Sequence, residues 1–130
     1  MATYNSWNGQ KVHGYKYLLI DVLKIELGFE GFIISDWKGV DQVTEDYKEA
    51  IKLSINAGVD MVMVPDRYKI FINYTKELVN EGQISMSRID DAVKRILKQK
   101  ILLGLFEQPY ATTSSAEIDA FGSTEHRDIA

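Results

Sequence analysis

Two short apolar runs constrain the fold of this chain more than any other feature. They occupy residues 31–36 and 59–64, and Pro65 ends the second run. Their apolar cores are continuous rather than alternating, which is typical of strands that are covered on both faces in a parallel sheet. A shorter strand is expected at residues 1–4. The sequence therefore predicts three strands of a parallel sheet.

Amphipathic segments alternate with these strands. Residues 15–27, 46–57 and 68–80 each carry apolar residues at helical spacing, and a glycine closes each segment. A further helix is expected to begin with Ser87 as its N-cap, because the acid Asp90 follows three residues later. Strands joined by helical crossovers predict right-handed βαβ units in an α/β fold.

The C-terminal part of the chain has a different character. Residues 110–124 are rich in Thr, Ser and Ala and are expected to form a linker. Residues 125–130 resemble the first turn of another helix, which is unstable alone because nucleation costs more than one turn returns. Three parallel strands also leave two unpaired sheet edges. We therefore expect this chain to be a piece of a longer protein. It would begin in the middle of one domain and end at the start of the next.

Composition and motifs exclude several classes of function. The net charge of −4 argues against an electrostatic grip on nucleic acid or anionic lipid. The absence of cysteine excludes disulfides, thiolate metal sites and a cysteine nucleophile. No glycine-rich phosphate loop, histidine pair at metal spacing or Gly-x-Ser-x-Gly motif occurs. We therefore expect no nucleic-acid or membrane partner, no metal and no cofactor.

Asp36 is the strongest candidate for chemistry. In parallel α/β sheets, sites form beyond the carboxyl ends of the strands, and Asp36 ends the second predicted strand. A carboxylate at that position can act as a nucleophile, a base or a metal ligand, or it can cap the following loop. Trp37 beside it offers a flat apolar face for a sugar ring, or it packs under the loop.

Other polar side chains are expected near the same edge of the sheet. Tyr4 and Asn5 follow the first strand and can donate hydrogen bonds to a polar ligand. His13 lies in the next loop, where a lone histidine is more often a surface residue than a site. Asp60, within a strand, is expected to be structural, and Asp66 to make a turn.

The combined motifs resemble glycoside hydrolase family 3, and they cover nearly the whole chain. The most specific element is Ser35-Asp36-Trp37 after a Gly-Phe strand. The other motifs are Ala2-Thr3-Tyr4-Asn5, Leu27-Gly28-Phe29-Glu30-Gly31-Phe32, Ala57-Gly58-Val59-Asp60-Met61, Val64-Pro65, Ser87-Arg88-Ile89-Asp90-Asp91-Ala92-Val93, Gly104-Leu105-Phe106 and His126-Arg127. Ser6-Trp7-Asn8-Gly9 and Met61-Val62-Met63-Val64-Pro65 resemble the branch of exo-acting β-glucan glucohydrolases and β-glucosidases.

The resemblance implies a fold and a division into domains. The family's first domain is a (β/α)8 TIM barrel, and residues 1–108 would be a partial barrel that holds its last three βα units. Residues 109–124 would be the interdomain linker, and residues 125–130 the truncated start of an α/β sandwich domain. The missing remainder of the chain is therefore an expected partner.

The resemblance also implies a mechanism. Asp36 aligns with the family's catalytic nucleophile, which should be ionised and attack the anomeric carbon while a second carboxyl group protonates the leaving oxygen. Trp37 would stack on the sugar in the leaving-group subsite, and Tyr4 would lie close to the nucleophile. The implied substrate is a β-glucoside or a β-glucan oligosaccharide. Because the family's acid/base comes from the second domain, this chain alone is expected not to hydrolyse glycosides.

Two other interpretations of the residues stay open. The chain could be a non-catalytic carbohydrate-binding or scaffold piece in which Trp7 and Trp37 bind sugar without chemistry. It could also belong to an unrelated (β/α) barrel enzyme such as a lyase or aldolase, although no lysine ends any predicted strand.

Overall fold

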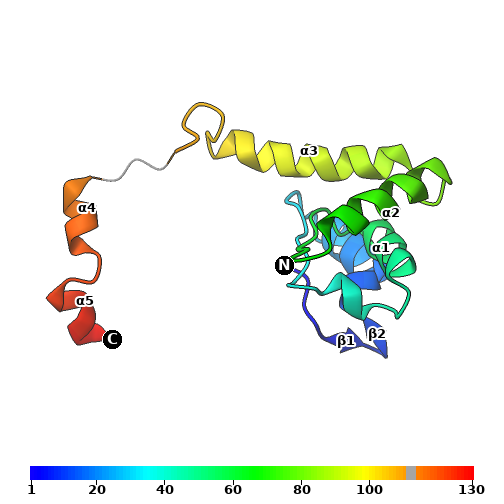
Figure 1. Ribbon diagram of the computed structural model, residues 1–130, viewed down its shortest axis with the longest axis horizontal. Helices are drawn as coiled ribbons and strands as arrows, with labels where there is room; N and C mark the ends of the chain where they lie inside the picture. Colours follow the sequence, from blue (N-terminus) through cyan, green and yellow to red (C-terminus); the bar gives the residue numbers. More distant parts are fainter. Residues whose placement is uncertain (111–113) are drawn as a thin grey trace. The chain divides into compact units, whose positions relative to one another are not determined.

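The computed structural model describes residues 1–110 and 114–130, in two compact units that cover Met1–Gln99 and Lys100–Ala130. Figure 1 labels the strands and α-helices, which are β1 Ser6–Trp7, β2 Gln10–Lys11, α1 Tyr47–Asn56, α2 Tyr68–Asn80, α3 Met86–Leu102, α4 Ser115–Ala120 and α5 Thr124–Ile129. Three further helical segments are η1 Val12–Gly14, η2 Tyr17–Glu26 and η3 Val40–Gln42.

The predicted strands are present as extended segments that lie next to one another. Ile34 forms a parallel bridge with Met61, as expected for a parallel sheet. Ala2 N–H donates to the carbonyl oxygen of Ile34 at 2.8 Å, whereas Ser35 N–H donates to that of Met61 at 2.9 Å. Because neighbouring residues of an extended chain point their backbone groups to opposite sides, the segment around Ile34 lies between the other two.

The lengths predicted for these strands are wrong. Instead of full strands at residues 1–4, 31–36 and 59–64, the structure has short extended segments, joined by the bridge of Ile34 with Met61 and by single main-chain hydrogen bonds. The ladder stops after Ser35 because the N–H of Met63 donates to the Ser35 hydroxyl oxygen at 2.8 Å, not to a main-chain carbonyl. The Ser35 hydroxyl thus takes the place of the main-chain carbonyl that would accept the next hydrogen bond of the ladder.

The helices lie close to their predicted positions. α2 has the predicted bounds, and α1 follows Asp46, whose carboxylate accepts the N–H groups of Lys48 at 2.8 Å and Glu49 at 3.1 Å. η2 differs in type, because it is a π-helix with bonds from one residue to the fifth before it. Leu27 N–H, for example, donates to Val22 O at 2.9 Å.

The start of α3 corrects a second prediction. α3 begins at Met86, and the N–H of Arg88 donates to Ser85 Oγ at 3.2 Å. Ser85 is therefore the N-cap, and the prediction of Ser87 is wrong. The two serine hydroxyls are hydrogen-bonded to each other at 2.9 Å, so Ser87 supports the capping residue instead of acting as one.

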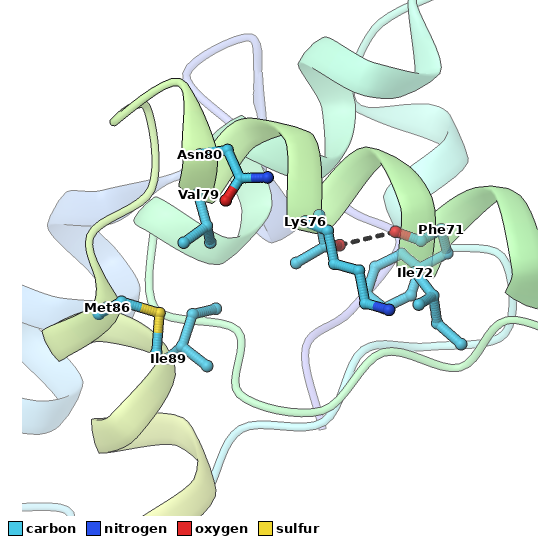
Figure 2. A pocket seen from close by; sticks show the side chains of 8 residues that line it. Phe71, Ile72, Lys76, Val79, Asn80, Met86 and Ile89 are labelled. Atoms are coloured by element: carbon cyan, nitrogen blue, oxygen red, sulfur yellow. Dashed lines mark hydrogen bonds between the residues drawn. The ribbon is translucent and has the colours of Figure 1, made fainter.

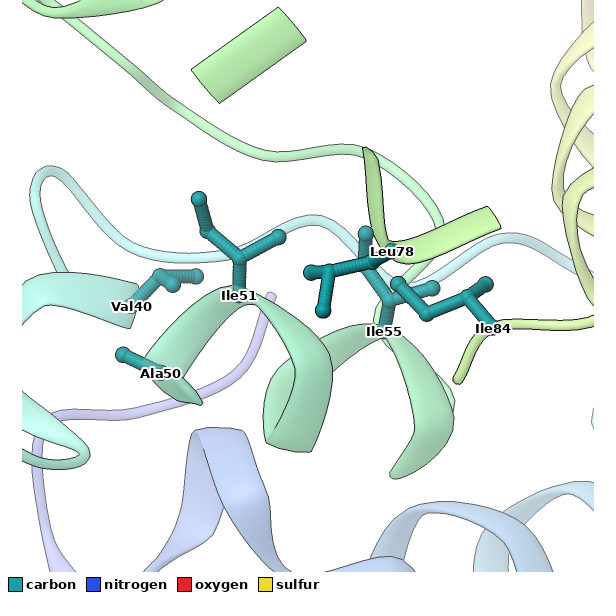
Figure 3. Close-up of a cluster of buried hydrophobic side chains, with 6 residues drawn as sticks. All are labelled: Val40, Ala50, Ile51, Ile55, Leu78 and Ile84. Atoms are coloured by element: carbon teal, nitrogen blue, oxygen red, sulfur yellow. The ribbon is translucent and has the colours of Figure 1, made fainter. Parts of the chain in front are cut away.

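Apolar side chains from the helices form the main core of the first unit. Figure 3 shows this cluster, in which α1, α2, η3 and the turn after α2 contribute Val40, Ala50, Ile51, Ile55, Leu78 and Ile84. Ile51 is fully buried and Leu78 nearly so. Burial stabilises each such side chain by about 1.5–3 kcal/mol. A second cluster, made of Ala2, Leu19, Ile33, Ala57 and Val59, lies around the extended segments.

The second unit contains α4 and α5. α4 lies within the stretch predicted as a linker, where Ser114 and Glu117 form a capping box. α5 confirms the helix expected near residues 125–130, and Ser123 caps it. Residues 111–113 of the predicted linker lie outside the described residues. The division into domains stays a prediction.

Among the described residues, no helix combines the length and the apolar character needed to cross a lipid bilayer.

Candidate active site

Hydrogen bonds to its main-chain N–H and carbonyl groups hold Asp36 at the end of the central extended segment. Its N–H donates to His13 Nε2 at 3.0 Å, and its carbonyl oxygen accepts the N–H of Gly39 at 3.0 Å. The N–H of Trp37 donates to Asp36 Oδ1 at 2.7 Å, which anchors one carboxylate oxygen. The residue is partly buried, and the bond from Trp37 restricts the orientation of its carboxylate.

The turn after Asp36 has an unusual backbone. Lys38 adopts a φ of +54°, in the left-handed region that non-glycine residues seldom occupy. Such conformations persist where surrounding contacts impose them, and they cluster at functional sites. Here the surrounding contacts include the bond from Gly39 back to Asp36 and a bond from Lys38 N–H to Met63 O at 3.4 Å.

Tyr4 and Trp37 lie beside Asp36, as the sequence predicted for side chains at this edge. The Tyr4 hydroxyl donates to the carbonyl oxygen of Trp37. Desolvation, followed by the negative charge of Asp36, raises the pKa of the Tyr4 phenol above its ordinary value. The Trp37 side chain stands free, with 59% of the residue exposed, so its ring is available to a ligand.

His13 overturns the expectation of a surface residue, because only 1% of it is exposed. Its ring lies 6.2 Å from the ring of Tyr4, and its Nε2 accepts the N–H of Asp36. Burial has the largest effect on the pKa of His13 and lowers it. The Asp36 carboxylate raises this pKa, and the Lys11 ammonium lowers it further. The sequence offered no signal for this burial, because the partners of His13 come from distant parts of the chain.

The remaining predicted residues have other partners. Asn5 is exposed, and Asp66 forms an ion pair with Lys38 at 2.7 Å. The Lys38 ammonium holds the pKa of Asp66 below its usual range. The Asp60 side chain is completely buried in a separate ion cluster, as expected for the structural role predicted for it.

Sequence reasoning missed the function of Ser35. This residue is fully buried, and its hydroxyl donates to Asp36 O at 2.9 Å while accepting the N–H of Met63 at 2.8 Å. Ser35 thereby joins two extended segments directly beneath the candidate nucleophile. A serine within an otherwise apolar run is the signal that could have indicated this role.

An apolar groove elsewhere in the first unit has different lining residues. It has a volume of about 400 Å³ and lies between α2 and the start of α3, as Figure 2 shows. Phe71, Val79, Met86 and Ile89 are among its lining side chains, and it includes none of Tyr4, Asp36 and Trp37. In the part of the chain described, no three His, Asp or Glu side chains gather where they could hold a metal ion.

Parallel extended segments followed by helices, with polar side chains at their carboxyl ends, define an α/β domain. Residues 1–99 match the model of the glycosyl hydrolase family 3 N-terminal domain. The chain belongs to glycosyl hydrolase family 3, and the resemblance stated from its motifs is confirmed.

Known relatives agree with this assignment. The structure of an exo-1,3/1,4-β-glucanase from a Pseudoalteromonas species is 46% identical and superposes with a TM-score of 0.84 over 96% of this chain and 20% of its own. A β-glucosidase from Listeria innocua, solved in complex with glucose, is 36% identical, with a TM-score of 0.83 over 97% of this chain and 18% of its own. A lysosomal β-glucosidase of Dictyostelium discoideum is 38% identical over 95% of this chain.

The chain spans only a small part of these relatives, namely 16% of the Dictyostelium protein and 20% of the Pseudoalteromonas enzyme.

Proposed function

We propose that this chain carries the nucleophile half of a retaining β-glucosidase or exo-β-glucanase site, with Asp36 as the nucleophile. The observation that carries the proposal is the fixed Asp36 carboxylate, beside an exposed Trp37, at the carboxyl end of adjacent parallel segments. This position is where TIM-barrel enzymes place their reacting groups. The names of the relatives support a β-linked glucose as the sugar that is removed.

The first step is the attack of Asp36 on the anomeric carbon. Because Trp37 N–H holds Oδ1, we expect Oδ2 to form the new bond to carbon. The glycosidic carbon–oxygen bond breaks, and the leaving oxygen takes a proton from a carboxylic acid that this chain does not supply. The products of this step are the free leaving group and a glycosyl ester on Asp36.

The second step releases the sugar. The same external carboxylate removes a proton from water, and the water oxygen attacks the anomeric carbon as the bond to Asp36 breaks. Two displacements at one carbon retain the anomeric configuration. Trp37 stacks on the leaving-group sugar, and the Tyr4 hydroxyl, which bonds the Trp37 carbonyl, positions the turn that carries both residues.

The same reasoning supports a site whose nucleophile comes from this chain and whose acid/base comes from the rest of a longer protein. Residues 1–108 provide the last three βα units of a partial (β/α)8 barrel, residues 109–124 a linker and residues 125–130 the start of an α/β sandwich domain. Loss of a general acid/base typically lowers a rate by about 10²–10⁴-fold. The chain alone should therefore show no turnover of an aryl β-glucoside above an Asp36→Asn control.

A chimera tests the assignment of the nucleophile. Residues 1–99 replace the matching segment of the Pseudoalteromonas exo-glucanase, which supplies the remaining barrel and the acid/base. We expect the chimera to hydrolyse an aryl β-glucoside, and a mechanism-based 2-fluoro sugar to label Asp36 in a mass-mapped peptide. Asp36→Asn should abolish both, whereas Asp66→Asn, which changes a carboxylate paired with Lys38, should preserve labelling. Label on any other residue ends the assignment.

A second candidate function is sugar binding without chemistry. It is favoured by the exposure of both tryptophans, Trp7 at 56% and Trp37 at 59%. Titration of the 130-residue chain with a β-glucan oligosaccharide distinguishes the two. Binding that survives Asp36→Ala but is lost in Trp37→Ala, together with an inactive chimera, would support the binding function.

A further inference from the structure

His13 is a buried titratable side chain to which the mechanism above gives no role. His13 comes from η1 and is 1% exposed, yet it touches the turn that carries Asp36. It is not placed to transfer a proton to the leaving group, because its Nε2 is occupied by the main-chain N–H of Asp36 at 3.0 Å. Its function must therefore be exerted through that bond.

The direction of this hydrogen bond sets the state of the ring. A backbone N–H can only donate, so Nε2 must accept and cannot carry a hydrogen. A neutral imidazole then carries its single hydrogen on Nδ1. The charged groups around the ring are the Asp36 carboxylate and the Lys11 ammonium, and the Tyr4 ring packs beside it. Burial has the largest effect on its pKa and lowers it, which favours the neutral form.

The turn also fits closely around the imidazole. A Cβ atom on Gly39 would lie 2.3 Å from His13 Nε2 and 2.5 Å from Cε1, so no side chain can be accommodated there. Gly39 has a φ of −64°, which any residue can adopt, so the requirement for glycine is steric and comes from the ring. Residues 36 and 39, at the two ends of the turn, thus both contact His13.

We infer that His13 is a positioning residue, whose neutral Nδ1–H imidazole holds the main chain of Asp36 and thereby aims the carboxylate. The effect of this positioning on catalysis rests on the proposed role of Asp36 as nucleophile. A protonated ring would present an N–H at Nε2 to the N–H of Asp36, and two donors cannot bond. Protonation of His13 therefore releases the turn.

The state of the ring can be measured without any activity. The chain has two histidines, so ¹⁵N spectra of the imidazoles in the 130-residue chain are assigned by His126→Gln. At neutral pH, His13 should show a hydrogen-free Nε2 and a protonated Nδ1. A hydrogen on Nε2, or rapid exchange between the two tautomers, would overturn the inference whatever the chimera does.

The consequence for catalysis is measured in the chimera, with active sites counted by the fluoro-sugar burst. Glutamine can place its amide oxygen where Nε2 lies and accept the Asp36 N–H, whereas leucine cannot. His13→Gln should keep kcat within a few-fold. In this variant, the pH profile of kcat should lack the fall at low pH that protonation of His13 causes. His13→Leu should lower kcat by roughly 10²-fold, the cost of a misplacement of about 1 Å, with a smaller change in KM.

The outcomes separate this inference from the proposed function. An active chimera that Asp36→Asn silences, with full kcat in His13→Leu, refutes the positioning role alone. The expected tautomer in an inactive, unlabelled chimera refutes the proposed function and leaves the bond from Asp36 to His13 in place. If His13→Leu does not fold, two other measurements still test the positioning role. These are the tautomer of His13 and the pH profile of kcat in His13→Gln.

Discussion

The Lys24 ammonium lies 2.9 Å from both carboxylate oxygens of Asp60, and solvent reaches only 6% of the lysine side chain and none of the aspartate side chain. Arg88 pairs with the same carboxylate, and Ile33 N–H donates to it at 2.8 Å. One buried carboxylate therefore connects η2, the central extended segment and α3.

Removal of Asp60 should strongly destabilise the first unit. Asp60→Ala leaves the buried Lys24 and Arg88 with only the half-exposed Asp91 as a counter-charge. Removal of one partner of a buried ion pair typically costs about 3–5 kcal/mol. We expect a loss of that size in the free energy of unfolding, measured by chemical denaturation. The matched control is Glu30→Ala, which removes the exposed pair of Glu30 with Lys98 and should cost about 1 kcal/mol or less. Similar losses in the two variants would contradict the role of Asp60.

Two buried serines should respond in opposite ways to alanine. Ser35→Ala leaves the partly buried N–H of Met63 without its acceptor, so it should cost about 1–3 kcal/mol of stability. Ser54 is equally buried, but among the described residues its hydroxyl has no hydrogen-bond partner. Ser54→Ala removes an unsatisfied polar group from α1 and should be neutral or stabilising. Thermal unfolding of both variants checks the prediction, and a larger loss at Ser54 would contradict it.

Local patterns were sufficient to place most of the helices, though not α4, and they did not give the contacts between segments. The spacing of apolar residues and the closing glycines gave α2 its predicted bounds and α1 nearly so, because these signals act over a few residues. The strands at residues 31–36 and 59–64 were predicted too long, since the hydroxyl of Ser35 interrupts their ladder. Periodicity carries no information about a side chain that bonds a residue 28 positions away.

The candidate site was predictable only in part for the same reason. Asp36, Trp37 and Tyr4 could be named because each lies at the carboxyl end of a predicted strand, and the carboxyl ends of parallel strands share one edge. The burial of His13 depends on the packing of η1 against the turn at Asp36, which no local pattern encodes. Whether these residues perform the proposed roles stays a prediction for the chimera to test.

Two glycines that close helices should differ in their tolerance of alanine. Gly82 has a φ of +69° and open space around its Cα, so Gly82→Ala should cost only the backbone strain of about 1–2 kcal/mol. Gly58 has a φ of +110°, and a Cβ there would lie 2.8 Å from Ile20 Cγ1. Gly58→Ala should cost about 1–3 kcal/mol more, through overpacking and through a φ outside the allowed left-handed helical region. Equal midpoints in urea unfolding would show that the space beside Ile20 does not matter.

The stability of the chain should depend on the protonation of His13. The pKa of His13 is lowered in the folded state, chiefly by burial, so the unfolded chain binds the proton at higher pH than the folded chain does. The free energy of unfolding should therefore fall as pH decreases below about 6.5, until the folded-state pKa is passed. Denaturant unfolding measured from neutral pH downward should show this slope in wild type and in His126→Gln. His13→Gln should flatten it, and an unchanged slope in that variant would assign the effect to other groups.

The exposed ring of Trp37 should contribute to the binding of the leaving-group sugar. In the chimera, Trp37→Ala removes an apolar face whose burial under a sugar is worth about 1.5–3 kcal/mol, or roughly 10–150-fold in kcat/KM. We expect this loss with a β-glucan disaccharide, and a smaller loss with methyl β-glucoside, which has little for the ring to cover. Trp7→Ala is the matched control, because Trp7 is as exposed as Trp37 but belongs to the hairpin of β1 and β2. Since stacking acts on the leaving group, labelling of Asp36 by a fluoro sugar with a small leaving group should persist in Trp37→Ala. Equal losses on both substrates would place Trp37 in support of the Asp36 turn, not in the leaving-group subsite.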